Sequence, residues 1–455
     1  MSFSRVLVAN RGEIALRIIR ACHEEGLEAV AVYSDADRLS PHVRAANDAV
    51  ALGPAPSAES YLNIPKLLEA ARISGCGAVH PGYGFLSERA AFAAAVTEAE
   101  LVFVGPPASA IQAMGDKTEA RRRMQAAGVP VVPGLTRTLV DAADAEREAK
   151  VMGFPLLLKA AAGGGGKGMR VLRSAGEVRS AYQAAQSEAY KAFGDGSVYL
   201  ERYVERPRHI EIQVLADQHG RVVSLGEREC SIQRRHQKLI EEAPSVVVTP
   251  GLRRRMGEAA AAAASAVGYV GAGTVEFLLA PDGEFFFLEM NTRIQVEHPV
   301  TELVYGVDLI REQLRIAAGQ PMRIAAGLLQ PRGHAIECRI TAEDPFSGFL
   351  PATGVVQYLR VPGGPGVRWD GGGRIRQRSH AVLRPVAREA DRVGGKPRRR
   401  DPADVARAAG AGDRGCADVA GVSPARACRP GVPPRRRGRH LRRPRGVATA
   451  RSPGE

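Results

Sequence analysis

The chain has 455 residues, 45% of them hydrophobic, and a formal net charge of +14, and this length predicts about two to four domains. No apolar run reaches about 18 residues, which excludes a membrane-spanning helix, and the N-terminal residues lack signal-peptide organisation, so a cytoplasmic location is expected. The charge does not indicate a nucleic-acid-binding core, because residues 371–455 hold 22 Lys+Arg and 7 Asp+Glu, whereas residues 1–370 hold 41 and 42.

Strands and helices alternate over the first quarter of the chain. Apolar strands are predicted at 5–9, 29–32, 78–79 and 101–105, and a helix with apolar spacing at 13–19. Buried strands that alternate with helices predict a parallel, doubly wound sheet. The first turn lacks G-x-G-x-x-G, so a dinucleotide site is not supported. Six cysteines without paired spacing suit reduced thiols.

Residues 131–203 are predicted to form a small separate module around a glycine loop. Two apolar strands flank glycines 163–166, whose backbone N–H groups can approach phosphate oxygens without obstruction by side chains. The loop is not a Walker A motif, because Gly168 follows Lys167 where serine or threonine is required. Lys159 precedes the loop and supplies a positive charge for phosphate. The alternative interpretation is a flexible surface turn.

A β-hairpin is predicted around Asp282-Gly283, the preferred pair for a two-residue turn. In that register Glu276 lies opposite Glu289, with Cβ atoms about 4.5–5.5 Å apart. Two facing carboxylates repel, and a divalent cation such as Mg²⁺ between them removes the repulsion. Asn291 shares the face of Glu289, because side chains alternate along a strand. The hairpin therefore predicts a metal site, and the alternative is two solvated glutamates on an exposed face.

The polar alternation continues beyond the hairpin. If the chain stays extended, one wall of the site is lined by the polar side chains of Glu289, Asn291, Arg293, Gln295 and Glu297. This combination suits a phosphorylated intermediate, with Arg293 for an anionic substrate and Glu297 as general base. A similar alternation places His209, Glu211 and Gln213 on one face of another strand. The basic run 233–238 is either a solvated loop or, beside an anionic site, a segment that binds phosphate and bicarbonate.

Seven segments closely resemble the biotin carboxylase family over about residues 3–372, and their motifs are highly specific. They are HPGYGFLSE (80–88), MGDK (114–117), KAAAGGGGKGMRV (159–171), RHIEIQVLAD (208–217), RRHQKLIEEAPS (234–245), EMNTRIQVEHPVTE (289–302) and GHAIECRITAEDP (333–345).

The resemblance implies an α/β and α+β fold in three domains. These are a Rossmann-like N-terminal domain at 1–115, an ATP-grasp domain at 116–330 with a mobile lid at 131–203, and an incomplete C-terminal domain that begins at 331–372. It implies a ligase that uses ATP and bicarbonate to form carboxyphosphate and then carboxylates biotin on a carrier protein. This is the first half-reaction of acyl-CoA carboxylases such as the acetyl-CoA carboxylase of fatty acid biosynthesis.

The resemblance also implies cofactors and partners. The cofactors are ATP and two metal ions, Mg²⁺ or Mn²⁺, with biotin as carrier-bound substrate. The partners are a biotin carboxyl carrier protein, carboxyltransferase subunits and a second copy in a homodimer, with no membrane and no specific nucleic acid. No biotin-acceptor Met-Lys-Met stretch is present, so the chain is expected to be a separate subunit of the complex.

Site residues carry over from the family position by position. The ATP contacts correspond to Lys117, Lys159, Gly165, Gly166, Glu201, Arg202, Tyr203, Val204, His209, Gln233, His236, Glu276 and Glu289. The metal ligands correspond to Glu276, Glu289 and Asn291, which the hairpin indicates independently, and the bicarbonate site to Lys238, Arg293 and Val296. Glu297 corresponds to the general base, and Tyr83 and Arg339 to biotin contacts, with Arg339 stabilising the biotin enolate. Arg293, Glu297, Lys238 and Arg339 are thus the catalytic candidates. Arg202, Val204 and Lys167 are small departures from the family pattern.

The resemblance stops after Gly372. Residues 371–455 contain no Phe, Tyr, Trp, Met or Asn, and one Lys against 21 Arg, a composition that predicts disorder for 373–455. Because the total length is close to that of the family, we hypothesise that this tail is translated in a shifted reading frame of GC-rich DNA. The alternative function is therefore a catalytically compromised protein whose basic tail binds polyanions without specificity.

Overall fold

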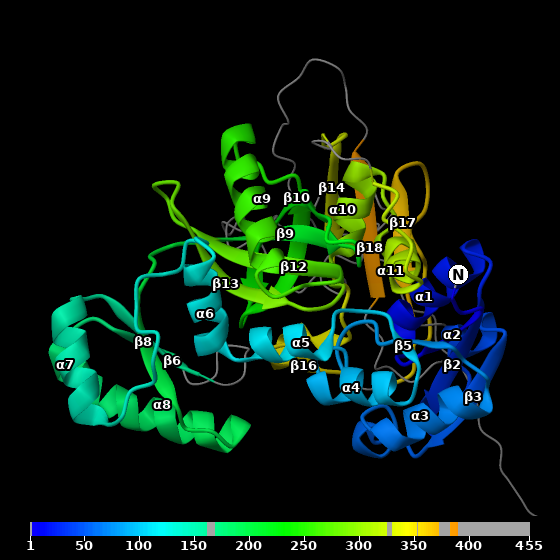
Figure 1. The fold of residues 1–455 in the computed structure, drawn as a ribbon, viewed down its shortest axis with the longest axis horizontal. Coiled ribbons are helices and arrows are strands. Elements are labelled where there is room, and N and C mark those ends of the chain that lie inside the picture. Colours follow the sequence, from blue (N-terminus) through cyan, green and yellow to red (C-terminus); the bar gives the residue numbers. More distant parts are fainter. Residues whose placement is uncertain (1, 162–168, 325–329, 353, 373–382, 390–455) are drawn as a thin grey trace, which may run out of the picture.

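The computed structural model describes residues 2–161, 169–324, 330–352, 354–372 and 383–389. Figure 1 shows the small module predicted at 131–203 at one end, a large central sheet with its helices, and the N-terminal part at the other end. Within these ranges, no helix is long and apolar enough to cross a membrane.

The N-terminal part is an α/β domain on a five-stranded parallel sheet of order β3-β2-β1-β4-β5, as predicted. Its strands are β1 (Arg5–Val8), β2 (Glu28–Ser34), β3 (Asp48–Gly53), β4 (Ala78–His80) and β5 (Val102–Phe103). Its helices are α1 (Gly12–Glu24), α2 (Pro41–Ala45), α3 (Ile64–Ile73), α4 (Ala90–Glu98) and α5 (Ala108–Gly115). The edge strand β3 was not predicted from its short apolar run 49–52, and most of its side chains are exposed or half-buried.

The described residues of the module predicted at 131–203 form a three-stranded antiparallel sheet with two helices, which projects away from the rest of the molecule (Figure 1). We keep the name lid for this module, as the expectation from the family resemblance. Helix α6 (Lys117–Ala126) leads into α7 (Ala142–Met152), β6 (Leu156–Ala160), β7 (Arg170–Leu172), α8 (Val178–Phe193) and β8 (Val198–Arg202). Leu156, Leu158 and Leu200 belong to a hydrophobic cluster confined to this part of the chain. The glycine loop candidates Gly165 and Gly166 lie between β6 and β7, outside the described residues.

The central sheet is antiparallel and has the order β13-β12-β9-β10-β11-β14-β18-β17. Its first strands are β9 (Arg208–Ala216), β10 (Val222–Arg234), β11 (Gln237–Ala243), β12 (Gly271–Leu279) and β13 (Phe285–Asn291). Strands β14 (His334–Cys338), β17 (Val367–Gly371) and β18 (Leu383–Glu389) extend it, and β15 (Glu343–Asp344) pairs with β16 (Leu350–Pro351) beside it. The associated helices are α9 (Pro250–Ser265), α10 (His298–Tyr305) and α11 (Leu309–Ala317).

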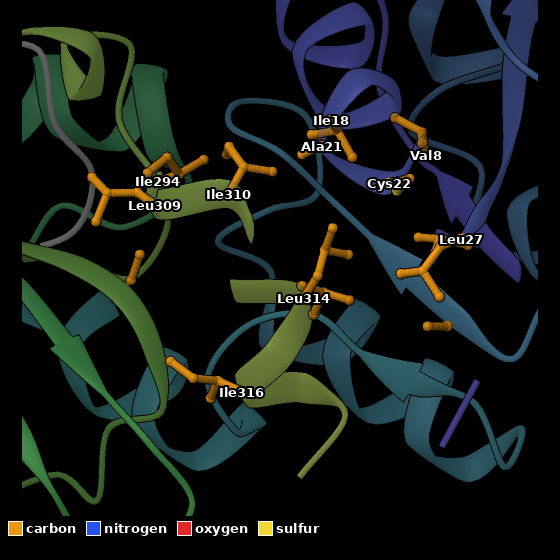
Figure 2. Close-up of a cluster of buried hydrophobic side chains, with 14 of the residues drawn as sticks. Val8, Ile18, Ala21, Cys22, Leu27, Ile294, Leu309, Ile310, Leu314 and Ile316 are labelled. Atoms are coloured by element: carbon orange, nitrogen blue, oxygen red, sulfur yellow. The ribbon is translucent and has the colours of Figure 1, made fainter. Parts of the chain in front are cut away.

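One hydrophobic core joins the N-terminal domain to the central part. Ile18 on α1 belongs to the same buried cluster as Leu314 on α11 and as Ile294, which follows β13 (Figure 2). The Ile294 side chain is fully buried. The segment that carries Arg293 and Gln295 is therefore anchored in a core that the first domain shares.

The tail differs from the expected disorder over seven residues. Leu383–Glu389 form β18, which pairs with β14 on one side and β17 on the other. The backbone of an extended segment can pair with the N–H and C=O groups at the edges of both neighbours, except that Pro385 has no N–H to donate. Residues 373–382 and 390–455, with most of the predicted disorder, lie outside the described residues.

Candidate active site

Glu276 on β12 lies directly opposite Glu289 on β13, as the hairpin predicted. The turn itself was predicted wrongly. The pairs nearer the turn are offset by one residue, Ala280 N donates to Glu284 O at 2.8 Å, and the loop between these two has three residues. A bulge at Leu288 then restores the register. The two deviations cancel, so the carboxylates still face each other.

A third carboxylate stands in the same row. On the neighbouring strand β9, Glu211 pairs with Glu276, so carboxylates from three adjacent strands lie side by side. His209 Nε2 lies 2.8 Å from Glu276 Oε2. Burial alone lowers the pKa of His209, but Glu276 outweighs burial and raises it. The predicted face of His209 and Glu211 is therefore confirmed as part of one charged cluster.

Lys238 holds this row of carboxylates together. Its Nζ lies 2.8 Å from Glu276 Oε1 and 2.7 Å from Glu297 Oε1, and it also donates to Glu211. Burial lowers the pKa of Lys238, but the three carboxylates raise it well above its usual value. Lys238 is therefore a fixed positive charge at the centre of the site.

The basic run 233–238 is the tip of a hairpin between β10 and β11. Arg234 pairs with Gln237, and the two turn residues Arg235 and His236 have φ of +51° and +65°, values typical of a tight two-residue turn. The turn places Lys238 at the start of β11, where its side chain reaches the carboxylates. His236 is exposed at the tip, and the Gln233 amide donates to the Cys230 carbonyl at 2.9 Å.

The chain beyond Asn291 is not extended, so the predicted continuous wall is wrong in its backbone. Its polar side chains nevertheless meet at the site: Ile294 is buried in the hydrophobic core, and Gln295 and Glu297 are buried among the charged groups. Arg293 Nη2 donates to Asn291 Oδ1 at 3.0 Å, and Gln295 Nε2 donates to Glu276 Oε1 at 2.9 Å. Val296, half-buried, leads directly to Glu297.

Glu297 lies between two cations at the start of α10. Its Oε1 faces Lys238, and its Oε2 accepts from Arg339 Nη2 at 2.9 Å. Arg339 directly follows β14, and its Nε also donates to Glu241 at 2.5 Å. Burial raises the pKa of the Glu297 carboxyl, but Lys238 and Arg339 outweigh burial and hold it well below its usual range. Glu297 is therefore a deprotonated base.

The lid side of the site carries two lysines. Lys159 Nζ donates to Glu201 Oε2 at 2.9 Å, and Arg121 binds the other oxygen of Glu201 at 2.9 Å. Burial lowers the pKa of Lys159, but Glu201 and Tyr199 raise it to about 12. Burial lowers the pKa of Lys117. Both ammonium groups belong to the elements that lead into and form the lid.

The residues after Glu201 continue the end of β8 into the chain that joins the lid to β9. Arg202 is exposed and stacks over the Phe286 ring at 5.9 Å, while Val204 is buried. Tyr203 N donates to Pro155 O at 3.1 Å. This segment thus connects the lid to the central sheet.

The oxygen ligands fit a divalent metal ion. Among the described residues, no side chain forms a hydrogen bond or close ion pair with the Glu289 carboxylate, and burial and Glu276 raise its pKa. A buried carboxylate in this state favours a cation, and oxygens suit Mg²⁺. Asn291 Nδ2 donates to Glu276 Oε1 at 2.8 Å, and Asn291 Oδ1 accepts from Arg293. To bind a metal ion, this oxygen would have to give up its hydrogen bond with Arg293.

Some contacts of the site and of the predicted residues were not foreseen. Arg228 contacts the charged cluster but lies in none of the seven segments, and Glu241 lies in RRHQKLIEEAPS but was given no role. Glu88 lies 2.9 Å from Arg293 Nε. HPGYGFLSE contains Glu88, but only the fold shows its partner. Tyr83 donates to Glu13 Oε1 at 2.6 Å within the N-terminal domain.

Three family models match the chain. They are the biotin carboxylase N-terminal domain over residues 2–111, the ATP-binding domain of the carbamoyl-phosphate synthase L chain over 116–325, and the biotin carboxylase C-terminal domain over 337–381. The last match extends beyond Gly372, where the resemblance was expected to stop.

Whole-chain comparisons agree. Biotin carboxylase of Nostoc sp. is 54% identical over 370 residues, or 81% of this chain and 83% of the relative, and that of Haemophilus influenzae is 54% identical over 367 residues, or 80% and 82%. A Campylobacter jejuni biotin carboxylase structure, described as a β-γ-ATP complex, has a TM-score of 0.83 at 45% identity and covers 86% of this chain and 88% of its own. A second structure is the biotin carboxylase domain dimer of Hydrogenobacter thermophilus 2-oxoglutarate carboxylase, with MgADP, ADP and bicarbonate. Its TM-score is 0.82 at 46% identity, and the match covers 85% of this chain and 86% of the other.

Proposed function

Because the chain belongs to the biotin carboxylase family, we propose that it carboxylates biotin on a carrier protein, using ATP and bicarbonate through carboxyphosphate. The observation that carries this proposal is Glu297, a buried base held between Lys238 and Arg339 beside the Glu276–Glu289 pair. This arrangement supplies a proton acceptor, cations for an anionic substrate and metal ligands in one place.

The proposed roles follow from the charge and the position of each side chain in the site. Lys238 and Arg293, with the backbone at Val296, bind bicarbonate, and Glu297 accepts the bicarbonate proton so that an oxygen can attack the γ-phosphorus of ATP and release ADP. The low pKa of Glu297 keeps it deprotonated until a substrate proton is in reach. Arg339 then interacts with the ureido oxygen of biotin and stabilises negative charge on it, with Tyr83 as a second biotin contact.

The remaining candidates are assigned to ATP and metal. Lys117 and Lys159 bind phosphate. The nucleotide is contacted by the 201–204 segment, His209, Gln233, His236 and the glycines 165–166. The lid 131–203 excludes water from the reaction. Glu276, Glu289 and Asn291 would hold Mg²⁺, which neutralises phosphate charge when bound. We propose in addition that the site holds a second metal ion and that Mn²⁺ can replace Mg²⁺. The MgADP and bicarbonate of the Hydrogenobacter domain support the assignments to nucleotide, Mg²⁺ and bicarbonate.

The partners proposed are a biotin carboxyl carrier protein, a second copy of the chain and carboxyltransferase subunits. The relatives named as biotin carboxylase and the domain dimer of Hydrogenobacter support the first two. The domain division proposed is 1–115, 116–330 and 331–372. No observation on the described residues favours the polyanion-binding alternative.

The test is ADP release by the purified full chain at saturating Mg²⁺ and ATP, with bicarbonate and free biotin varied. We expect hydrolysis that requires bicarbonate and rises with biotin. The Glu297→Gln variant, which keeps the size of the side chain, should lose about 10²- to 10⁴-fold in rate. Bicarbonate-independent hydrolysis, or equal rates in the variant, would contradict the proposal.

A further inference from the structure

Arg228 is the most completely bonded side chain beside the site. It lies on β10 with no exposed surface, and each of its five N–H groups donates a hydrogen bond. The acceptors are Glu211, Gln213 Oε1 at 2.7 Å, Thr301 Oγ1 at 2.9 Å, Thr274 Oγ1 at 3.0 Å and Gln295 Oε1 at 3.0 Å. These residues come from β9, β12, α10 and the chain before α10, so one guanidinium connects four parts of the fold.

Arg228 fixes the orientation of the Gln295 amide. A guanidinium can only donate, so the oxygen of Gln295 must face Arg228 and its NH₂ group must face away. The NH₂ group then donates to Glu276 Oε1 at 2.9 Å. Glu276 is thereby held in place through Gln295 by a residue that it does not itself contact.

A second path leads from Arg228 to Lys238. Arg228 Nε binds one oxygen of Glu211, and the other oxygen of Glu211 accepts from Lys238 Nζ. Glu211 is itself fully buried. The position of its second oxygen, and hence of the ammonium group, therefore depends on the planar guanidinium.

We propose that Arg228 is a positioning residue for bicarbonate activation, acting on Lys238 through Glu211 and on Glu276 through Gln295. This inference rests on the function proposed above. The planar shape of the side chain is the essential property, because lysine has the same charge but only three N–H groups on a single nitrogen. The ATP contacts on the lid and at 201–204 do not involve Arg228, whereas Glu276, a proposed metal ligand, is positioned by it through Gln295. The bicarbonate site, which Arg228 reaches through Lys238 as well, should therefore respond more strongly than the binding of MgATP.

The test compares Arg228→Lys with Arg253→Lys in the full chain. Arg253 also forms an ion pair with a buried glutamate, Glu227, at 2.6 Å, but on the side of α9 and away from the cluster. We expect Arg228→Lys to lower kcat/KM for bicarbonate by about 10- to 100-fold, the range for residues that orient functional ligands. The KM for ATP should change by a smaller factor than kcat/KM for bicarbonate, and Arg253→Lys should keep wild-type kinetics.

Crystal structures of the wild type and of Arg228→Lys provide a readout independent of activity. We expect Gln295 Nε2 to leave Glu276 and Lys238 to shift away from Glu276 in the variant. Unchanged contacts in the variant would overturn the inference. So would a loss of activity that is explained entirely by a smaller fraction of folded protein. If the wild type itself lacks bicarbonate-dependent hydrolysis, the proposed function fails, while the structures still decide the role of Arg228.

Discussion

Replacing Lys238 by methionine tests the charge network directly, since the side chain is of similar length but uncharged. The ammonium group of Lys238 lies 2.7 Å from Glu297 and 2.8 Å from Glu276, and the Lys238 side chain is only 13% exposed. Breaking a buried ion pair by removing one partner costs about 3–5 kcal/mol, because the remaining charges stay buried. We therefore expect Lys238→Met to lose about this much free energy of unfolding at pH 8.

The loss should depend on pH. Lys238 now helps to hold the pKa of Glu276 and Glu297 below the usual range, so without it both pKa values rise in the folded protein. The folded variant then takes up protons more readily as the pH falls, and its stability recovers relative to wild type. The difference between the two proteins is thus largest at pH 8 and shrinks toward pH 5.

Urea unfolding followed by circular dichroism at pH 8, 6.5 and 5 measures this difference. Lys191→Met on α8, at an exposed position, is the control and should stay within about 0.5 kcal/mol of wild type. A Lys238→Met variant as stable as wild type at pH 8, or one whose deficit grows as the pH falls, would refute the ion network described for this site.

Three further predictions concern the metal, the core and acid stability. Glu289→Gln should raise the Mg²⁺ concentration for half-maximal ATP hydrolysis by about tenfold or more, and superimposable Mg²⁺ titrations would count against Glu289 as a ligand. Ile294→Ala should lower the free energy of unfolding by about 2–5 kcal/mol in urea, because the side chain is fully buried, and a smaller loss would show that the core does not anchor this segment. Burial and Arg17 lower the pKa of His80 to about 3, so its contribution to stability is complete above pH about 6.5 and falls by about 1.4 kcal/mol per pH unit below it. His80→Gln should flatten the pH dependence of the urea midpoint between pH 6.5 and 5, and an unchanged slope would exclude His80 as its source.

Local patterns were enough to predict the parallel N-terminal sheet and the pair Glu276–Glu289. Alternation with a period of two and a turn signal act over a few residues, and such signals are readable from one sequence. The turn shows the limit of this reasoning. Asp282-Gly283 indicated a two-residue turn, but the chain forms a longer loop and a bulge at Leu288. The pairs between the turn and the bulge are offset by one residue, and only those beyond the bulge keep the predicted register, because the two shifts are equal and opposite.

Contacts between distant segments could not be predicted in this way. Arg228 stands among consecutive charged residues, Glu227-Arg228-Glu229, a pattern that does not indicate burial. In the fold its partners include Gln295 and Thr301, which lie more than sixty residues away in the sequence. A buried arginine is stable only when all its N–H groups find acceptors, and that condition depends on the three-dimensional arrangement.

The geometry of the site depends on packing more than on regular backbone. Strand β13 ends at Asn291, yet Arg293, Gln295 and Glu297 still reach the carboxylate row. The reason is that Ile294 is buried in the core shared with α1 and α11 (Figure 2), and a well-packed core fixes the direction of the neighbouring side chains. The N-terminal domain thereby helps to place the base, and for this reason a change on α1 that opens this core should affect catalysis without touching any substrate.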